Sequence, residues 1–248
     1  YMVSVANDGE YFVACQEPTH LKIVEKVTQK WNTTVFGSDY SAHIGNDPLD
    51  LGVYWAQYLN YSNVEIMSQN TAEEANDLTD TLNQSINNVN AMGGGVIYFP
   101  EGTYYLGPNV FMKSNVMIVG AGQDKTEICY IGDKGTVWFR GRRFGEKASS
   151  NVGIARLTLS CQHESLYHEG EGWYVPDRII SFDSTEDYGI DIDKADSENK
   201  FIIDVEVKGK LRTDGVPAGG NQSILVGAHK NVIYKNLRLN GPTFYNRV

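Results

Sequence analysis

The chain has 248 residues, of which 41% are hydrophobic and 11% aromatic, and its formal net charge at pH 7 is −10. This length and composition are typical of a globular protein with one large domain or two small ones. The negative charge argues against purely electrostatic binding to nucleic acid or to an anionic membrane, and no apolar run reaches the roughly 18 residues of a membrane span. We therefore expect no nucleic-acid partner and no membrane insertion. An acidic polysaccharide is not excluded, because cations held by carboxylates can bridge two anions.

The first 70 residues carry two helical signals. Apolar residues recur at helical spacing in "PTHLKIVEKVTQKW" (18–31), and Asp47 and Pro48 provide a cap and a first helical residue for "NDPLDLGVYWAQYL" (46–59). We expect residues 1–70 to form a mixed α/β extension that packs against the rest of the protein.

The clearest helix is predicted for residues 71–92. Thr71 and Glu74 form a capping box, and Gly93 stands where a left-handed C-terminal cap is expected. The apolar stripe between them is Leu78, Leu82, Ile86 and Val89.

From Gly94 onward, short β-branched runs alternate with Gly, Asn, Asp and Ser, and one phrase recurs. It appears as "NVMIVG" (115–120), "NVGIARLTL" (151–159), "NKFIIDVEV" (199–207) and "NVIYKNLRL" (231–239). The pattern predicts stacked strands. In the second copy we expect the residues Val152, Ile154, Leu157 and Leu159 to point inward. The repeated asparagine suits a corner, where its amide can stack on the asparagine of the next turn.

A stack of parallel strands leaves its first turn open, and something must cover that end. The helix at 71–92 can lie across it, because the glycines at 93–95 allow a sharp reversal into the first strand.

Two stretches, "LTDTLNQSINNVNAMGGGVIYFPEGTYYL" (78–106) and "LGPNVFMKSNVMIVGAGQDKTEI" (106–128), resemble the amino-terminal cap and first turns of pectate-lyase-like right-handed β-helices, nearest to the rhamnogalacturonase and epimerase-like branch. The resemblance implies an all-β solenoid over residues 71–248, a right-handed parallel β-helix with an amino-terminal capping helix. The chain ends directly after a repeat phrase and without an evident cap, so we expect it to be a fragment of a longer β-helix.

Most members of this superfamily handle polysaccharides, which implies a polysaccharide or oligosaccharide partner and a secreted or cell-surface location. The short motifs of polygalacturonases and of pectate lyases are missing from the sequence. Two functions stay open. The first is cleavage of a glycosidic bond by hydrolysis or β-elimination, and the second is a non-catalytic glycan-binding, adhesive or tailspike-like module.

The insertion "CQHESLYHEGEGWYVPD" (161–177) directly follows a predicted core strand and carries His163, Glu164, His168, Trp173 and Tyr174. An aromatic ring here could stack on a sugar and a histidine could transfer protons, so His168, Trp173 and Tyr174 are candidate substrate-binding residues. The alternative is a solvated loop pinned by one tryptophan.

A second acidic stretch, residues 181–199, contains Asp183, Asp187, Asp191, Asp193 and Asp196. Closely spaced carboxylates could bind Ca²⁺ or act as an acid and a base, although the spacing lacks the glycine and closing glutamate of a calcium loop. A polar surface loop is the alternative. We assign no metal site and expect no cofactor, with Ca²⁺ as the one possible ion.

The candidate catalytic residues come from "FIIDVEVKGKLRTDG" (201–215). If Ile203, Val205 and Val207 point inward, then Asp204, Glu206 and Lys208 line one exposed face, and Arg212 and Asp214 follow in the next corner. Acids and a base on the floor of a groove suit sugar chemistry, with the 161–177 loop as one wall. The alternative is the ordinary charged face of a soluble strand. Weaker candidates near the end of the chain are His229, Tyr245 and Arg247.

Overall fold

The computed structural model describes residues 12–13, 63–141, 149–182, 198–210, 223–226, 230–240 and 243–246, with side chains for 63–141, 149–182, 199–210 and 236–240. Within these ranges the protein is rich in β-strands, which form two mostly parallel sheets and one small antiparallel hairpin. The two helical segments expected at 18–31 and 46–59 lie outside the described residues.

The larger sheet, within the described ranges, has 10 strands. They are β1 (Phe12–Val13), β2 (Val64–Ile66), β3 (Gly95–Phe99), β4 (Gly102–Leu106), β6 (Val116–Gly120), β7 (Thr126–Tyr130), β9 (Val152–Ser160), β13 (Glu198–Lys208), β15 (Lys230–Lys235) and β16 (Arg238–Asn240). The smaller sheet has 5 described strands: β5 (Val110–Phe111), β8 (Val137–Arg140), β12 (Arg178–Ser181), β14 (Ser223–Val226) and β17 (Thr243–Asn246).

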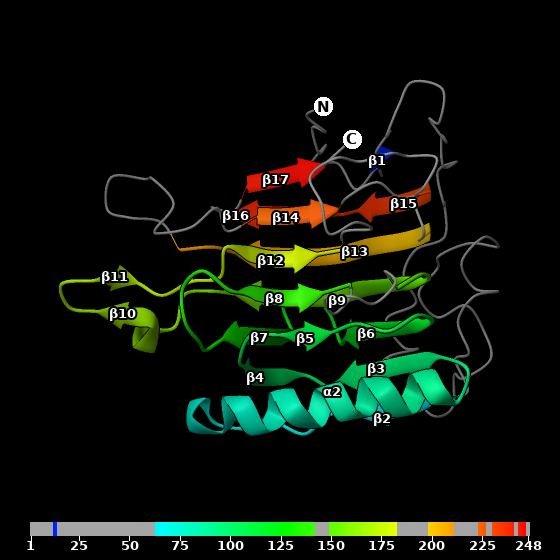
Figure 1. Ribbon diagram of the computed structural model, residues 1–248, viewed down its shortest axis with the longest axis horizontal. Helices are drawn as coiled ribbons and strands as arrows, with labels where there is room; N and C mark the ends of the chain where they lie inside the picture. The colour runs from blue at the N-terminus through cyan, green and yellow to red at the C-terminus, as the bar shows by residue number, and fades with distance from the viewer. Residues whose placement is uncertain are drawn as a thin grey trace.

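The chain passes from one sheet to the other and back. After β3 and β4 it enters the smaller sheet as β5, returns as β6 and β7, and crosses again as β8, and the later strands follow the same order. Each return places a new strand in parallel beside the equivalent strand of the previous passage, so that β3, β6, β9, β13 and β15 follow one another in the stack (Figure 1).

The recurrent phrases are neighbours in this stack and are in register. Val152 is paired with Lys200, and Lys200 with Val232, so the asparagine that begins each phrase occupies the same position in each strand. The predicted stacking of asparagines is confirmed: the Asn151 amide donates to Asn115 Oδ1 at 2.6 Å, and the Asn199 amide donates to Asn151 Oδ1 at 2.6 Å.

Long strands bend at one residue, and the bend changes which side chains point inward. Arg156 in β9 and Asp204 in β13 have φ angles of 57° and 55°. Ile154 and Leu157 flank the first bend and both belong to the core, as predicted. In β13 the expectation was wrong for Ile203, because the core residues on either side of the bend are Ile202 and Val205.

The helix predicted at 71–92 is confirmed as η3 (Ala72–Glu74) followed by α2 (Ala75–Ala91), which lies across one end of the strand stack (Figure 1). The Glu74 carboxylate accepts a hydrogen bond from the Thr71 backbone N–H at 2.9 Å, which completes the capping box. The stripe of Leu82, Ile86 and Val89 is fully buried.

The glycine triplet after α2 is required by both conformation and space. Gly93 and Gly94 have φ angles of 91° and 102°, which other residues rarely adopt. A Cβ atom on Gly94 would lie 2.4 Å from the carbonyl oxygen of Asn115. The chain therefore reverses tightly against the next strand.

The core lies between the two sheets and against the apolar stripe of α2. Two short strands from the first 70 residues join the larger sheet, since β2 pairs with β3 in parallel and β1 pairs with β15 in antiparallel fashion. The extent of the amino-terminal extension stays a prediction. No helix in the described part of the chain is long and apolar enough to cross a membrane.

Candidate functional site

The outward surface of the larger sheet changes character at the bend. Before it, outward residues such as Tyr98, Met117 and Phe201 are buried. After it, outward residues from five neighbouring strands are mostly polar, and we call them the polar face. They form two rows in register, Thr103–Glu127–Thr158–Glu206–Arg238 and Tyr105–Cys129–Ser160–Lys208–Asn240.

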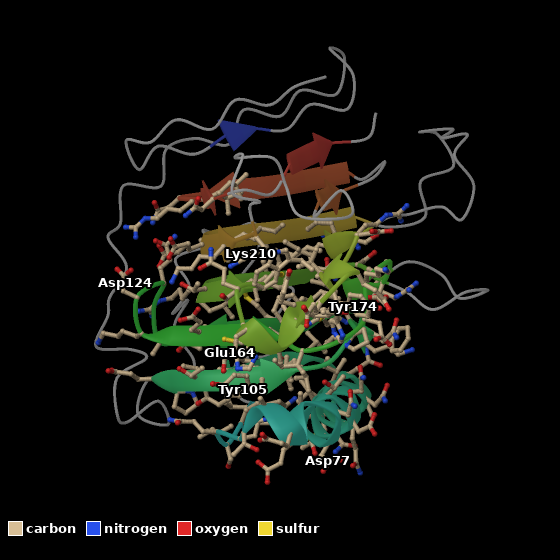
Figure 2. The ribbon with its side chains drawn as sticks, turned by 90° about the vertical axis from the view of Figure 1, so that its left-hand side faces the viewer. Asp77, Tyr105, Asp124, Glu164, Tyr174 and Lys210 are labelled. Carbon is tan, nitrogen blue, oxygen red and sulfur yellow. The ribbon has the colours of Figure 1, made fainter. Side chains whose placement is uncertain are left out.

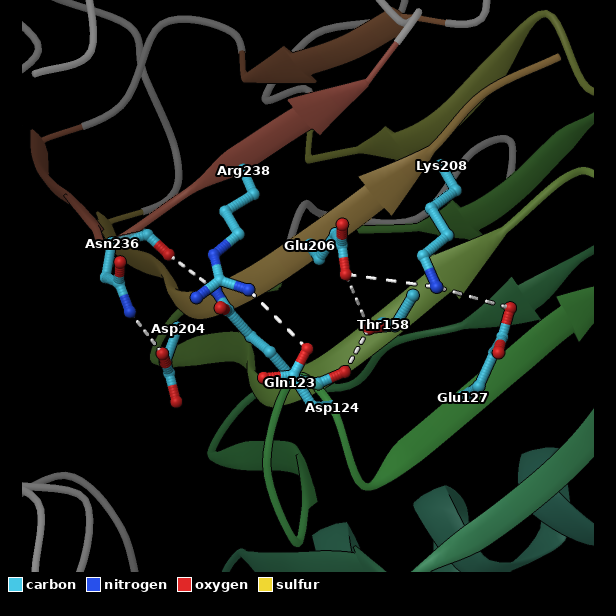
Figure 3. A network of polar contacts seen from close by, with 9 residues as sticks. All are labelled: Gln123, Asp124, Glu127, Thr158, Asp204, Glu206, Lys208, Asn236 and Arg238. Carbon is cyan, nitrogen blue, oxygen red and sulfur yellow. Dashed lines mark hydrogen bonds and ion pairs between the residues drawn. The ribbon is translucent and has the colours of Figure 1, made fainter. Parts of the chain in front are cut away.

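A cation lies between two carboxylates at the centre of the polar face. Lys208 Nζ is 3.9 Å from Glu127 Oε1 and 4.0 Å from Glu206 Oε2 (Figure 3). The side chains of Glu127, Glu206 and Lys208 are 37%, 17% and 32% exposed, so all three can be reached from solvent while remaining partly fixed. The two glutamates come from strands β7 and β13, with Thr158 of β9 between them.

Thr158 connects this cluster to the neighbouring loop. Its hydroxyl lies 3.3 Å from Glu206 Oε2 and also donates to the backbone carbonyl of Gln123. A hydroxyl has one proton, so the two acceptors share a single donor. This arrangement positions Glu206 more firmly than Glu127, which is also the more exposed of the two glutamates.

Cys129 lies in the second row, beside Ser160, but it is not a plausible nucleophile. Burial, reinforced by the charge of Glu127, raises the pKa of the Cys129 thiol to about 12. The thiolate is therefore scarce at neutral pH, and reactive cysteines require the opposite shift. Burial also raises the pKa of the Cys161 thiol.

One edge of the polar face is formed by the loop 121–125 between β6 and β7. Asp124 Oδ1 is 3.5 Å from Arg238 Nη1, and Gln123 Nε2 donates to the Asn236 carbonyl at 2.8 Å. In Figure 2 Asp124 lies at one side of this face, and Tyr174 lies at the opposite side.

The opposite edge carries the hairpin of β10 (Tyr167–His168) and β11 (Gly172–Trp173), which lies within the predicted loop 161–177. Lys210 Nζ lies 3.9 Å from the centre of the Trp173 ring, and the His168 ring stacks on Tyr174 at 3.8 Å. These three candidate binding residues are thus brought to one edge, but each aromatic ring already has a face in contact with a neighbouring side chain. Tyr167, at 54% exposure, presents more free surface.

The predicted catalytic residues separate into three groups. Glu206 and Lys208 meet at the cluster described above. Asp204 lies at the bend, where its carboxylate accepts a hydrogen bond from the Asn236 amide. Arg212 and Asp214 lie outside the described residues, so their catalytic role stays a prediction.

The remaining sequence candidates also lie beyond what is described. They are Asp183, Asp187, Asp191, Asp193, Asp196, His229 and Arg247, together with the side chain of Tyr245. Within the described part of the chain no group of three His, Cys, Asp or Glu residues could hold a metal ion.

Two charged residues of the polar face were missed by sequence reasoning, Glu127 and Arg238. Glu127 precedes Ile128 in "KTEICY", and Arg238 lies between the two leucines of "NLRL", so each is a charged residue at an alternating position of a strand. The repeat alignment contained the signal for Arg238, because its register partner is Glu206.

Comparison with known proteins shows where this architecture belongs. A family model described as rhamnogalacturonase A/epimerase, pectate lyase-like, matches residues 67–243. The mannuronan C5-epimerase AlgE3 of Azotobacter vinelandii is 32% identical over 189 residues, which are 66% of this chain and 10% of that protein. Alginate lyase 7 of the same organism is 26% identical over 183 residues, which are 65% of this chain and 21% of that protein.

Among solved structures, the A-module of the Azotobacter vinelandii mannuronan C-5 epimerase AlgE4 is 21% identical and has a TM-score of 0.41, with 71% of this chain and 48% of that chain covered. The surface adhesin PfbA of Streptococcus pneumoniae is 18% identical with a TM-score of 0.43, covering 68% and 36% of the two chains. The chain spans only 10% to 21% of the length of its curated relatives. Because the family model matches most of its residues, the chain belongs to the rhamnogalacturonase A/epimerase, pectate lyase-like family.

Proposed function

We propose that this chain winds as a right-handed parallel β-helix and acts on an acidic polysaccharide that lies across the polar face. Support for the winding comes from the regular return of the chain to a parallel neighbouring strand. Support for the substrate comes from the relatives, which by name act on mannuronan and alginate. Mannuronan, as its name states, is a polymer of a uronic acid. A secreted or cell-surface location would suit such a substrate.

The observation that carries the proposal is the ammonium group of Lys208 between the carboxylates of Glu127 and Glu206. A uronate carboxylate can exchange with one of these glutamates and bind Lys208. The positive charge then stabilises the negative charge that develops when the proton next to the substrate carboxylate is removed.

The different exposure and contacts of the two glutamates support different roles for them. Glu127 is the more exposed and is the one we expect the substrate to displace, which frees its carboxylate to accept the proton. Glu206 stays in contact with Lys208 and Thr158. The electrons of the C5–H bond form a C4–C5 double bond, the C4–O bond breaks, and the departing oxygen takes up a proton from solvent water. The result is cleavage by β-elimination.

Hydrolysis is the second candidate, and the closeness of the two carboxylates supports it. Both glutamate oxygens lie within 4.0 Å of one nitrogen, so they are at most about 8 Å apart, an upper limit that is compatible with the carboxylate pairs of glycosidases. In that reaction one carboxylic acid protonates the glycosidic oxygen and the other activates water or attacks the sugar.

The test is an assay of the purified protein on mannuronan, alginate and a neutral glucan. Unsaturated sugar ends, detected by ultraviolet absorbance, indicate elimination. New reducing ends without unsaturation indicate hydrolysis, and a changed C5 configuration in NMR spectra indicates epimerisation.

The variants Glu127→Gln and Lys208→Met should each lower kcat/KM at least about 100-fold, because each removes a proton-transfer or charge-stabilising group. Glu206→Gln should also lower kcat/KM, because it removes the carboxylate that holds Lys208 in position. Asp77→Asn, on the exposed surface of α2, is the matched control and should retain activity. Full activity in all three polar-face variants would exclude this cluster from the mechanism. Binding without reaction would favour the non-catalytic glycan-binding module.

A further inference from the structure

The loop 121–125 reaches across the sheet to a distant strand. It follows β6, whereas Arg238 belongs to β16, and β9 and β13 lie between β6 and β15 in the sheet. Asp124 nevertheless contacts Arg238 at 3.5 Å, over 114 positions of sequence (Figure 3). The contact with Arg238 is not needed to connect β6 to β7, so it calls for another explanation.

The loop is held in place without Asp124. Gln123 Nε2 donates to the Asn236 carbonyl at 2.8 Å, and Arg156 Nη2 donates to the Ala121 carbonyl at 3.1 Å. Within the loop, the Lys125 backbone N–H donates to the Gly122 carbonyl at 3.1 Å. The Asp124 carboxylate can therefore be removed or displaced while the loop keeps its position.

Arg238 stands where a second acidic sugar could bind. It is the register partner of Glu206, one strand beyond Lys208, and about 8 Å from Lys208 by the dimensions of a parallel sheet. The planar guanidinium group matches a carboxylate better than an ammonium group does, because it can donate two parallel hydrogen bonds.

The pair between Arg238 and Asp124 is exposed, with side chains 51% and 79% accessible. Exposed pairs are weak and exchange partners easily. A carboxylate on a bound polysaccharide has the same charge as Asp124 and can take its place, whereas a neutral sugar has no group that can compete for the guanidinium.

We propose that Arg238 is a second binding position for the carboxylate of an acidic sugar, and that Asp124 occupies this position in the free protein as an internal competitor. The inference rests on the proposed function, since it requires an acidic polysaccharide on the polar face. It adds a determinant of specificity: a polysaccharide binds with full affinity only when the sugar beside the one at Lys208 is also charged.

The experiment measures the Kd of mannuronan oligosaccharides for the wild-type protein and its variants by calorimetry at low salt. Asp124→Asn keeps the size and the loop but removes the competing charge, so the Kd should fall about two- to fivefold. Arg238→Ala removes the binding group, so the Kd should rise about five- to tenfold, and Arg238→Lys should lie between Arg238→Ala and the wild type. Circular dichroism verifies that each variant is folded.

Glu101→Gln provides the matched control. Glu101 forms a similar exposed ion pair with Lys125 of the loop 121–125, at 4.0 Å. The Glu101 pair does not involve Arg238. This variant should bind mannuronan oligosaccharides like the wild type, and a neutral oligosaccharide should show no difference among any of the variants.

Two results would count against the inference, and they can be told apart. If the wild type binds mannuronan oligosaccharides and both Asp124→Asn and Arg238→Ala bind them equally well, the second position does not exist while the proposed function stands. If the wild type binds no mannuronan or alginate oligosaccharide, the proposed function and this inference are both wrong.

Discussion

At the scale of single residues, Asn115, Asn151 and Asn199 form a ladder at the start of three neighbouring strands. All three have left-handed backbones, with φ angles of 63°, 56° and 60°. Asparagine tolerates this conformation better than most residues, and its amide has both a donor and an acceptor for the next asparagine in the stack. Each asparagine thus adopts the left-handed conformation of the bend and also hydrogen-bonds to the neighbouring strand.

Replacing Asn151 should separate these two contributions. Asn151→Gly keeps the left-handed backbone and loses two hydrogen bonds, so we expect the free energy of unfolding to fall by about 1–3 kcal/mol. Asn151→Ala also strains the backbone and should cost about 1 kcal/mol more than Asn151→Gly. Urea denaturation measures both. Asn87→Ala, on the exposed side of α2, is the control and should raise the free energy of unfolding slightly, by less than about 1 kcal/mol, because alanine is the better helix former.

The bend residues show why single positions are hard to predict. Strict alternation places Asp204 beside Glu206 and Lys208, but a left-handed residue shifts the pattern by one position. The sequence does contain a sign of this shift, because the inward residues Ile154 and Leu157 of "NVGIARLTL" are three positions apart. Ile202 and Val205 have the same spacing in "NKFIIDVEV", which pairs with it in register, but a prediction from strict alternation misses it there.

At the scale of elements, α2 covers one end of the strand stack with its apolar stripe. Leu82, Ile86 and Val89 are fully buried, while Thr81 is exposed and its hydroxyl donates to the Asp77 carbonyl at 2.9 Å. The helix therefore contributes to stability mainly through packing and only slightly through its exposed side.

Leu82→Ala should accordingly lower the free energy of unfolding by about 2–5 kcal/mol, because it leaves a cavity between the helix and the sheets. Thr81→Ala, one residue away on the exposed side, should change it by less than about 1 kcal/mol. Chemical denaturation of both variants checks this. Equal costs for the two substitutions would mean that α2 does not cover the core.

The elements that sequence could predict are those with local signals. The capping box, the apolar stripe, the glycine triplet and each copy of the repeated phrase can be read from a short stretch of sequence, and the structure confirms them. The loop 121–125 carries no such signal. Its contacts with Asn236 and Arg238 depend on strands far away in the sequence, so its role as an edge of the polar face could not be predicted.

At the scale of the whole molecule, the parallel pairing of strands that are far apart in sequence determines which side chains lie on the same face. Glu127, Glu206 and Arg238 are separated by up to 111 residues in sequence and lie in one row because their strands are in register. The outward residues before the bend are buried, whereas those after it are mostly polar. The candidate site is therefore restricted to one half of the larger sheet.

The most direct test of the account is a crystal structure of the protein with a bound mannuronan oligosaccharide, using Glu127→Gln to prevent turnover. We predict that the sugars lie across the polar face, with one carboxylate within about 4 Å of Lys208 Nζ, the distance of an ion pair. An oligosaccharide that binds elsewhere on the protein and leaves Glu127, Glu206 and Lys208 without a sugar contact would contradict it.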